Sequence, residues 1–222
     1  MCEVDKEKPF NKFWFAVLGA LLGLIASAIS GYLIVIWQYN VEKEKDKFNL
    51  YIDTRVVCNQ LEDEYKKLIN RKINLKYYGV MLRNSSATKT YSYNDKNSEM
   101  FVEKSQSETE DNKQESVKYR FLIEESNVKI ENQHKELSKC LEMIKWYFDI
   151  DSELNDTIIH LNMSQFNDDL AFPKDTFSNI QNHDELKKQK EILEKQGNEY
   201  LQKWFIQHRD KLLKGLKDQI DI

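Results

Sequence analysis

The hydrophobic pattern begins with a long uncharged apolar run near the start of the chain. Residues 13–37 are 25 consecutive residues without a charged side chain. About 20 apolar helical residues, at roughly 1.5 Å each, cross the hydrocarbon core of a bilayer. Trp14 near one end, and Tyr32 and Trp37 near the other, are residue types that favour the membrane interface. The pattern predicts a single transmembrane helix over 13–37, preceded by a short tail over 1–12.

A cleaved signal peptide is the alternative interpretation of this run. Its apolar stretch spans about 7–15 residues and ends in a cleavage site made of small residues. The run observed here is longer, and bulky residues at 33–37 follow its last small residues. We therefore expect a retained membrane anchor.

Small residues recur at every fourth position within the predicted span: Gly19, Gly23, Ser27 and Gly31. With Ala16, Ala20 and Ser30 beside them, they form one stripe on a helix. Small side chains let two membrane helices approach closely, where lipid provides no hydrophobic drive for association. Glycine and alanine are also common in membrane helices generally, but their register here favours self-association of the anchor. A pore is not favoured, because no charge or polar ring lines the stripe.

Apolar positions continue at helical spacing beyond the span. No Gly or Pro occurs in the 47 residues of 32–78. Leu61, Tyr65 and Leu68 illustrate the spacing of three and four residues that is typical of a half-buried helix. The pattern predicts that the membrane helix continues unbroken into the soluble part as a stalk over 38–82.

The pattern changes over 84–116, where Ser, Thr, Asn and charged residues dominate. Such a composition is typical of a surface loop. Two pieces, 88–93 and 99–103, alternate weakly and could pair as a small hairpin. The sequence therefore predicts a polar insertion here, as a loop or a hairpin.

A second helix is predicted over 117–161. Apolar residues seven apart, as in a coiled coil or bundle, form its seam: Ile123, Ile130, Leu137 and Ile144. Asp151 and Asp156 bracket a predicted break in this segment.

A loop over 162–183 contains Pro173, and a last helix is predicted over 184–217 with Asp184 as its N-cap. The apolar stripe of this helix includes Leu193, Leu201, Trp204 and Leu212. Gly197 lies on the stripe, where it permits a bend or a close helix approach.

Composition supports a helical fold. The chain has 222 residues but only 6 Gly and 2 Pro, whereas β-sandwiches and α/β folds use these residues in their many turns. The predicted fold class is all-α: one N-terminal transmembrane helix that continues into an elongated three-helix bundle (38–222) with antiparallel, coiled-coil-like packing. Its lean apolar content favours completion of the core by self-association.

Candidate chemistry is sparse. The four histidines stand in no metal-binding spacing, and the glycines beyond the span are too far apart for a phosphate loop. We expect no enzymatic activity, no cofactor and no metal site. A net charge of −4 does not favour nucleic acid as a partner. The locally basic last helix leaves anionic lipid or a nucleotide messenger open as a ligand, without supporting either.

The side of the membrane is weakly indicated. Lysines are nearly balanced across the span, so the positive-inside rule gives little direction. Cys58 and Cys140 each fall within a predicted helix, and nothing in their spacing requires a disulfide. We expect a plasma (inner) membrane protein with a cytoplasmic soluble domain.

Three functional hypotheses follow. The first is a non-enzymatic single-pass membrane protein that self-associates through the small-residue stripe and binds or senses a protein partner through its bundle. The second is a membrane-perturbing effector of bacterial phage defence that is triggered through its soluble domain. The third is an extracytoplasmic receptor or envelope scaffold, which a Cys58–Cys140 disulfide would favour.

Overall fold

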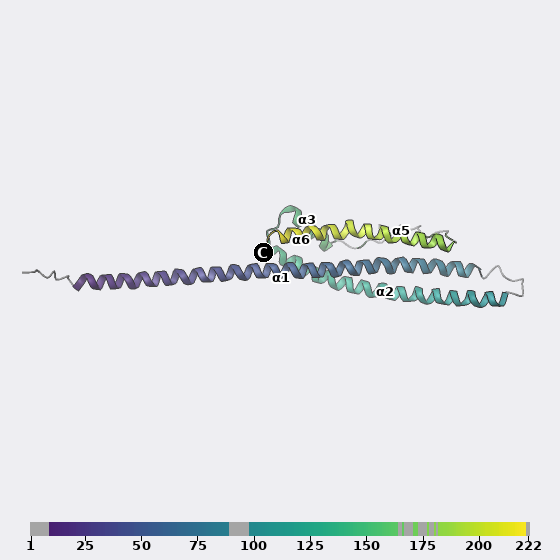
Figure 1. The fold of residues 1–222 in the computed structure, drawn as a ribbon, viewed down its shortest axis with the longest axis horizontal. Helices are drawn as coiled ribbons and strands as arrows, with labels where there is room; N and C mark the ends of the chain where they lie inside the picture. Colours follow the sequence, from purple (N-terminus) through teal and green to yellow (C-terminus); the bar gives the residue numbers. More distant parts are fainter. Residues whose placement is uncertain are drawn as a thin grey trace, which may run out of the picture. The chain divides into compact units, whose positions relative to one another are not determined.

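The computed structural model describes residues 9–88, 98–163, 166, 171–172, 177, 180 and 182–220. Every extended regular element in these ranges is helical, which confirms the all-α fold class. The elements are α1 (Pro9–Thr88), α2 (Ser98–Tyr147), α3 (Ser152–Met163), α5 (His183–Leu201), a π-helical turn (Gln202–Ile206) and α6 (Gln207–Lys217) (Figure 1). The chain divides into two units, Met1–Phe48 and Asn49–Ile222. The N-terminal part of α1 belongs to the first unit, and the rest of α1 belongs to the second.

Helix α1 is a single helix of 80 residues. The predicted continuation of the anchor helix without a break is therefore confirmed. In the first unit, the side chains of 13–43 are exposed except for that of Val17, which is partly covered. The apolar N-terminal part of α1 is long and apolar enough to cross a membrane, and none of that window is buried within the protein.

In the second unit, α2 runs antiparallel to α1 (Figure 1). Tyr65 of α1 is hydrogen-bonded to His134 of α2, whereas Tyr78, further along α1, stacks on Tyr119, further back along α2. Between these pairs, Arg71 Nη1 donates to the Leu122 carbonyl at 2.7 Å and to Ser126 Oγ at 2.5 Å. The hairpin is thus held by polar contacts as well as by its apolar seam.

The segment from α5 to α6 is also antiparallel to α1. Glu62 of α1 pairs with Arg209 of α6, and Tyr77 of α1 lies against His183 at the start of α5. The segment α5–α6 and helix α2 therefore run in the same direction along α1. Helix α3 packs against α6 and α2.

The core lies between these helices. Residues buried from every side include Leu61, Ile69 and Ile73 of α1, Leu137 and Ile144 of α2, and Leu193, Leu201, Phe205 and Leu212 of the C-terminal segment. Burying side chains of this size stabilises each by about 1.5–3 kcal/mol relative to exposure. The spacing of three and four residues on α1 thus reflects a face that is covered by two other helices.

Helix α5 approaches α1 closely at Gly197. A Cβ atom at this position would lie 2.7 Å from Ile69 Cγ2 and 3.3 Å from Phe172 Cε1. Of the two alternatives predicted for this glycine, a bend or a close helix approach, the structure shows the close approach.

The predicted polar loop over 84–116 is wrong over most of its length. Helix α1 continues to Thr88 and α2 begins at Ser98, so the proposed hairpin piece 99–103 is helical. Residues 89–97, with most of the other hairpin piece, lie outside the described residues. Nine of the nineteen residues of 98–116 are Glu, Lys or Gln, which favour helix intrinsically, and none is Gly or Pro. The polar composition here therefore did not indicate a loss of helix.

Two helix starts are capped by polar side chains. A break does occur in the predicted second helix, but it lies at 148–151 and not between Asp151 and Asp156, which is inside α3. Asp151 Oδ1 accepts the Leu154 backbone N–H at 2.7 Å and caps α3. The N-cap of α5 is Asn182, whose side chain accepts the Asp184 N–H at 2.9 Å. The prediction of Asp184 as the cap is wrong by two residues, because Asp184 already lies in the first turn of α5. Its negative charge there interacts favourably with the positive end of the helix dipole.

Candidate functional site

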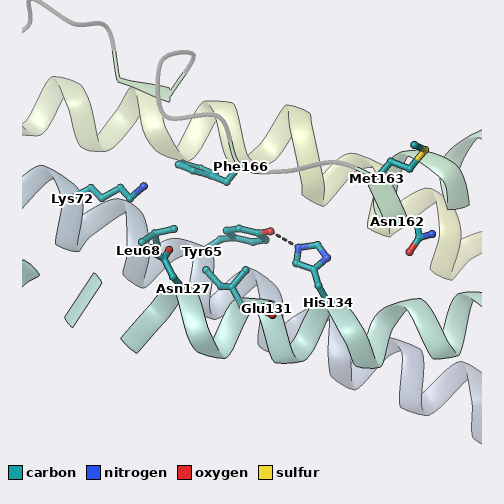
Figure 2. A pocket seen from close by; sticks show the side chains of 10 residues that line it. Tyr65, Leu68, Lys72, Asn127, Glu131, His134, Asn162, Met163 and Phe166 are labelled. Atoms are coloured by element: carbon teal, nitrogen blue, oxygen red, sulfur yellow. Dashed lines mark hydrogen bonds between the residues drawn. The ribbon is translucent and has the colours of Figure 1, made fainter. Parts of the chain in front are cut away.

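A cavity of about 360 Å³ opens between α1, α2 and α3 in the second unit (Figure 2). The helices contribute polar and apolar side chains in similar numbers. The lining residues are Tyr65, Leu68 and Lys72 of α1, Asn127, Ile130, Glu131 and His134 of α2, Asn162 and Met163 of α3, and Phe166.

A tyrosine–histidine hydrogen bond forms the back of the cavity. Tyr65 Oη lies 2.5 Å from His134 Nε2. Burial lowers the pKa of His134 below its ordinary value and raises the pKa of Tyr65 well above 10. Both groups are therefore neutral at pH 7, and the tautomer of the imidazole sets which of the two donates in this hydrogen bond.

Tyr65 is also the centre of an aromatic cluster. Its ring lies 5.8 Å from that of Phe166, in a stacked geometry, and 5.0 Å from that of Trp204, edge to face. Phe166 in turn contacts Tyr200 and Trp204. Such pairs add about 0.5–1.5 kcal/mol each beyond the area they bury. The ring that carries the hydroxyl is consequently packed on several sides by other aromatic rings.

The mouth of the cavity carries charge and amides. Lys72 Nζ lies 5.7 Å above the Phe166 ring, within cation–π range. Glu131 pairs with Lys135 at 2.8 Å on the exposed surface of α2. Asn162 Oδ1 accepts a hydrogen bond from Ser138 Oγ at 2.6 Å, which orients its amide.

This arrangement is suited to binding. Nε2 of the His134 imidazole is engaged by the Tyr65 hydroxyl. The amides and Lys72 offer donors at the mouth, while Leu68, Ile130 and Phe166 offer apolar contact. Ligand pockets commonly combine a mostly apolar wall with a few placed polar groups.

Two further histidines stack at the junction of α3 and α6. The rings of His160 and His208 are 3.7 Å apart and nearly parallel. His160 Nε2 donates to the Trp204 carbonyl at 2.9 Å, within the π-helical turn, where the backbone bonding shifts by one residue. His208 Nδ1 is buried without a hydrogen-bond partner, and the pKa of His208 is lowered by burial, then by His160 and Lys211.

The structure leaves the predicted membrane stripe uncovered by the rest of the described chain. A Cβ atom at Gly19, Gly23 or Gly31 would meet nothing within 4 Å. Ala16, Ala20, Ser27 and Ser30 are likewise exposed, and Ser30 Oγ donates back to the Ala26 carbonyl at 2.8 Å. The stripe is thus free to meet another helix.

The predicted bundle residues lie inside the bundle. Leu137, Ile144, Leu193, Leu201 and Leu212 are buried, and Ile123, Ile130 and Trp204 pack against the core while partly exposed. None of these forms the cavity except Ile130.

Cys58 and Cys140 are free thiols, and both are buried. Burial raises the pKa of Cys58 to about 12 and also raises the pKa of Cys140. Within the described part of the chain, no group of three or more His, Cys, Asp or Glu side chains is arranged to hold a metal ion.

Sequence reasoning missed the pairing of Tyr65 with His134. The sequence contained a signal: His134 stands three residues before Leu137 and seven before Leu141, both buried, so it shares the face of α2 that meets α1. Which residue of α1 lies opposite depends on the register of the hairpin. The spacing within either helix does not reveal that register.

The fold defines this chain as a helical-bundle protein with one helix apolar enough to span a membrane. Comparison with protein-family models, with curated proteins and with solved structures finds no match. Function must therefore be argued from the site itself.

Proposed function

We propose that this chain is a single-pass membrane protein that self-associates through the small-residue stripe and binds a partner in the cavity of its helical bundle. The observation that carries the proposal is that one helix, α1, contributes both the uncovered stripe and the Tyr65–Lys72 wall of the cavity. Because an α-helix is stiff along its axis, rotation or separation of anchors is coupled to that wall. The proposal assigns the cavity to binding and places the bundle in the cytoplasm, which the two free thiols support.

The stripe can be tested with a matched pair of variants in the full-length protein. Gly23→Leu places a bulky side chain on the stripe, whereas Ala28→Leu adds comparable bulk about 140° around the helix from Gly23. We expect Gly23→Leu to shift the protein to monomer in detergent and Ala28→Leu to leave the oligomer intact. Size-exclusion chromatography with light scattering gives both masses, and a monomeric starting protein would contradict the proposal.

The cavity can be tested at its rim. Met163 lines the cavity and is 76 % exposed, so a photo-crosslinking residue there would sit beside a bound partner. The control position is Ile192 of α5, which is also exposed and does not line the cavity. We expect a defined adduct from position 163 only. The same adduct pattern from both positions would contradict the proposal that the cavity binds the partner.

The same preparations can distinguish a membrane-perturbing effector from a protein that only binds a partner. Reconstituted oligomer that releases a trapped dye from vesicles would favour that function over partner binding. We expect the vesicles to remain sealed.

A further inference from the structure

The cavity between α1, α2 and α3 has side-chain amides toward its two ends. Asn127 and Asn162 both line it, and both are exposed. Figure 2 shows the Tyr65–His134 pair between them. Ser138, whose hydroxyl donates to Asn162 Oδ1 at 2.6 Å, lies eleven residues after Asn127 on α2. At 1.5 Å per residue, the two amides are therefore about 16 Å apart along the helix.

Both amides have hydrogen-bonding groups left for a partner. In the described part of the chain, the Asn127 side chain makes no hydrogen bond, and Asn162 uses only its Oδ1. An asparagine amide has two N–H donors and an acceptor oxygen, and a peptide unit has one donor and one acceptor. A side-chain amide can thus pair with the backbone N–H or C=O of another chain. Amides at both ends fit a peptide backbone that crosses the cavity.

The free backbone groups that these amides require indicate an extended segment. Within a helix the backbone N–H and C=O groups are already bonded to each other, whereas an extended segment leaves them available. An extended chain rises about 3.3 Å per residue, so about five residues span 16 Å. The cavity volume of about 360 Å³ is at the small end of the range for ligand sites. The segment therefore runs along the mouth and inserts a side chain.

The surface between the amides suits an apolar side chain. Leu68, Ile130 and Phe166 contribute its apolar contacts. Glu131 at the mouth is already paired with a neighbouring lysine at 2.8 Å, so its charge is compensated. Lys72, toward one end of the cavity in Figure 2, lies with its Nζ 5.7 Å over the Phe166 ring. Its positive charge disfavours a basic residue in the bound segment.

We propose that the cavity holds an extended segment of about five residues from a protein partner, with its backbone on Asn127 and Asn162 and an apolar side chain inserted between them. This assignment rests on the proposed function, in which the cavity binds the partner, and it names the form in which the partner binds. In such recognition the backbone hydrogen bonds give affinity, and the pocket for the inserted side chain gives specificity.

Peptides of defined sequence test the segment with the full-length protein in nanodiscs. The probes are fluorescein-labelled peptides Ser-Ala-X-Ala-Ser with a C-terminal amide, in which X is Leu, Met, Phe, Trp, Ala, Asp or Lys. Fluorescence anisotropy, corrected with empty nanodiscs, gives the dissociation constants. Because burial of a large apolar side chain is favourable, we expect the best apolar X to bind about tenfold more tightly than Ala, Asp or Lys. Equal affinities across the set, or no binding above empty nanodiscs, would overturn the proposal.

The amides are tested with a matched pair of variants on α2. Asn127→Ala removes an amide at the cavity, whereas Asn132→Ala removes an exposed amide that does not line it. We expect Asn127→Ala to weaken binding of the best peptide by about two- to tenfold, the range for one net hydrogen bond, and Asn132→Ala to leave it unchanged. Circular dichroism establishes that both variants keep their helix content. Equal affinities for the two variants would refute the role of the amide.

The second amide is tested by a change that keeps its internal contact. Asn162→Asp removes the N–H donors but retains an oxygen to accept from Ser138. We expect the same two- to tenfold loss for the five-residue peptide, on the order of one net hydrogen bond. A three-residue peptide spans only about 10 Å, so it should respond to Asn127→Ala or to Asn162→Asp but not to both. A short peptide that responds to both would contradict the spacing.

Crosslinking at position 163 separates this binding mode from the proposed function. Asn127→Ala and Asn132→Ala are each combined with the photo-crosslinking residue at that position. A lower yield of the partner adduct with Asn127→Ala alone supports the bound segment. An equal yield with both variants would leave partner binding in place and refute this form of it. Absence of any adduct in the unchanged bundle would instead contradict the proposed function, and the peptide affinities would then decide the binding mode alone.

Discussion

At Gly197 the absence of a side chain allows α5 to reach α1. An alanine Cβ would lie 2.7 Å from Ile69 Cγ2, a branch methyl group on a fully buried residue that cannot easily move. Overpacking of this kind costs about 1–3 kcal/mol, which exceeds the gain of up to about 1 kcal/mol in helix propensity. We therefore expect Gly197→Ala to lower the melting temperature of the bundle.

A second glycine provides the matched control for that change. Gly79 lies in α1, and a Cβ there would meet nothing within 4 Å. Gly79→Ala should stabilise the bundle by up to about 1 kcal/mol through helix propensity alone. Thermal melts followed by circular dichroism should move in opposite directions for the two variants, and a shared direction would contradict the close approach.

We predict that the free energy of unfolding of the bundle falls in mild acid, because the pKa values of two half-buried histidines are lowered. Burial, His160 and Lys211 lower the pKa of His208 below 6.5, and burial lowers that of His134. The unfolded chain binds these protons more readily, so their contribution to stability is complete above about pH 6.5 and is lost as the pH falls toward the folded pKa values.

The measurement is denaturant unfolding at pH 7.5 and at pH 5.5. We expect a smaller free energy of unfolding at pH 5.5 for the unchanged protein and a smaller pH difference for His208→Gln. His183 serves as the control position, because it is exposed at the start of α5. Equal pH differences for His208→Gln and His183→Gln would show that His208 does not titrate in this way.

At the scale of elements, the break between α2 and α3 is held by one carboxylate. Asp151 Oδ1 accepts the Leu154 N–H at 2.7 Å, whereas Asp156 is exposed in the middle of α3. Removing an N-cap costs about 0.5–2 kcal/mol. Asp151→Ala should destabilise the bundle by that amount in chemical unfolding. Asp156→Ala should be neutral or slightly stabilising, and similar losses for both would argue against the cap.

Elements were predictable where apolar spacing was continuous. Leu61, Tyr65 and Leu68 in α1, and Leu137 and Ile144 in α2, have the spacing that a packed helix requires, and they are buried. The failure over 98–116 has a physical cause: a run of helix-forming residues can continue a helix without an apolar stripe.

The cavity was beyond prediction for a different reason. Its back wall depends on which turn of α1 faces His134, and its mouth depends on where Asn162 and Phe166 fall after α3. Each is set by packing between segments that are far apart in the sequence. Periodicity within one helix reveals which face is buried but not which residue of another helix it meets.

At the scale of the whole molecule, the side on which the bundle lies can be tested with thiol chemistry, but not with the native cysteines alone. Cys58 and Cys140 are buried, and burial raises the pKa of both, so little reactive thiolate is present in the folded bundle. We expect both to react slowly with maleimide in the folded protein and rapidly after denaturation. Rapid labelling of either in the native protein would contradict their burial.

An introduced cysteine then reports the side directly. Lys188 of α5 is exposed, so Lys188→Cys in a Cys2→Ser background offers an accessible thiol on the bundle. For a cytoplasmic bundle, a membrane-impermeant maleimide should label this thiol only after the cells are permeabilised. Labelling in intact cells would place the bundle outside and would favour an extracytoplasmic receptor. Since denatured samples from the same cells show the total thiol, absence of label can be attributed to the membrane and not to a missing protein.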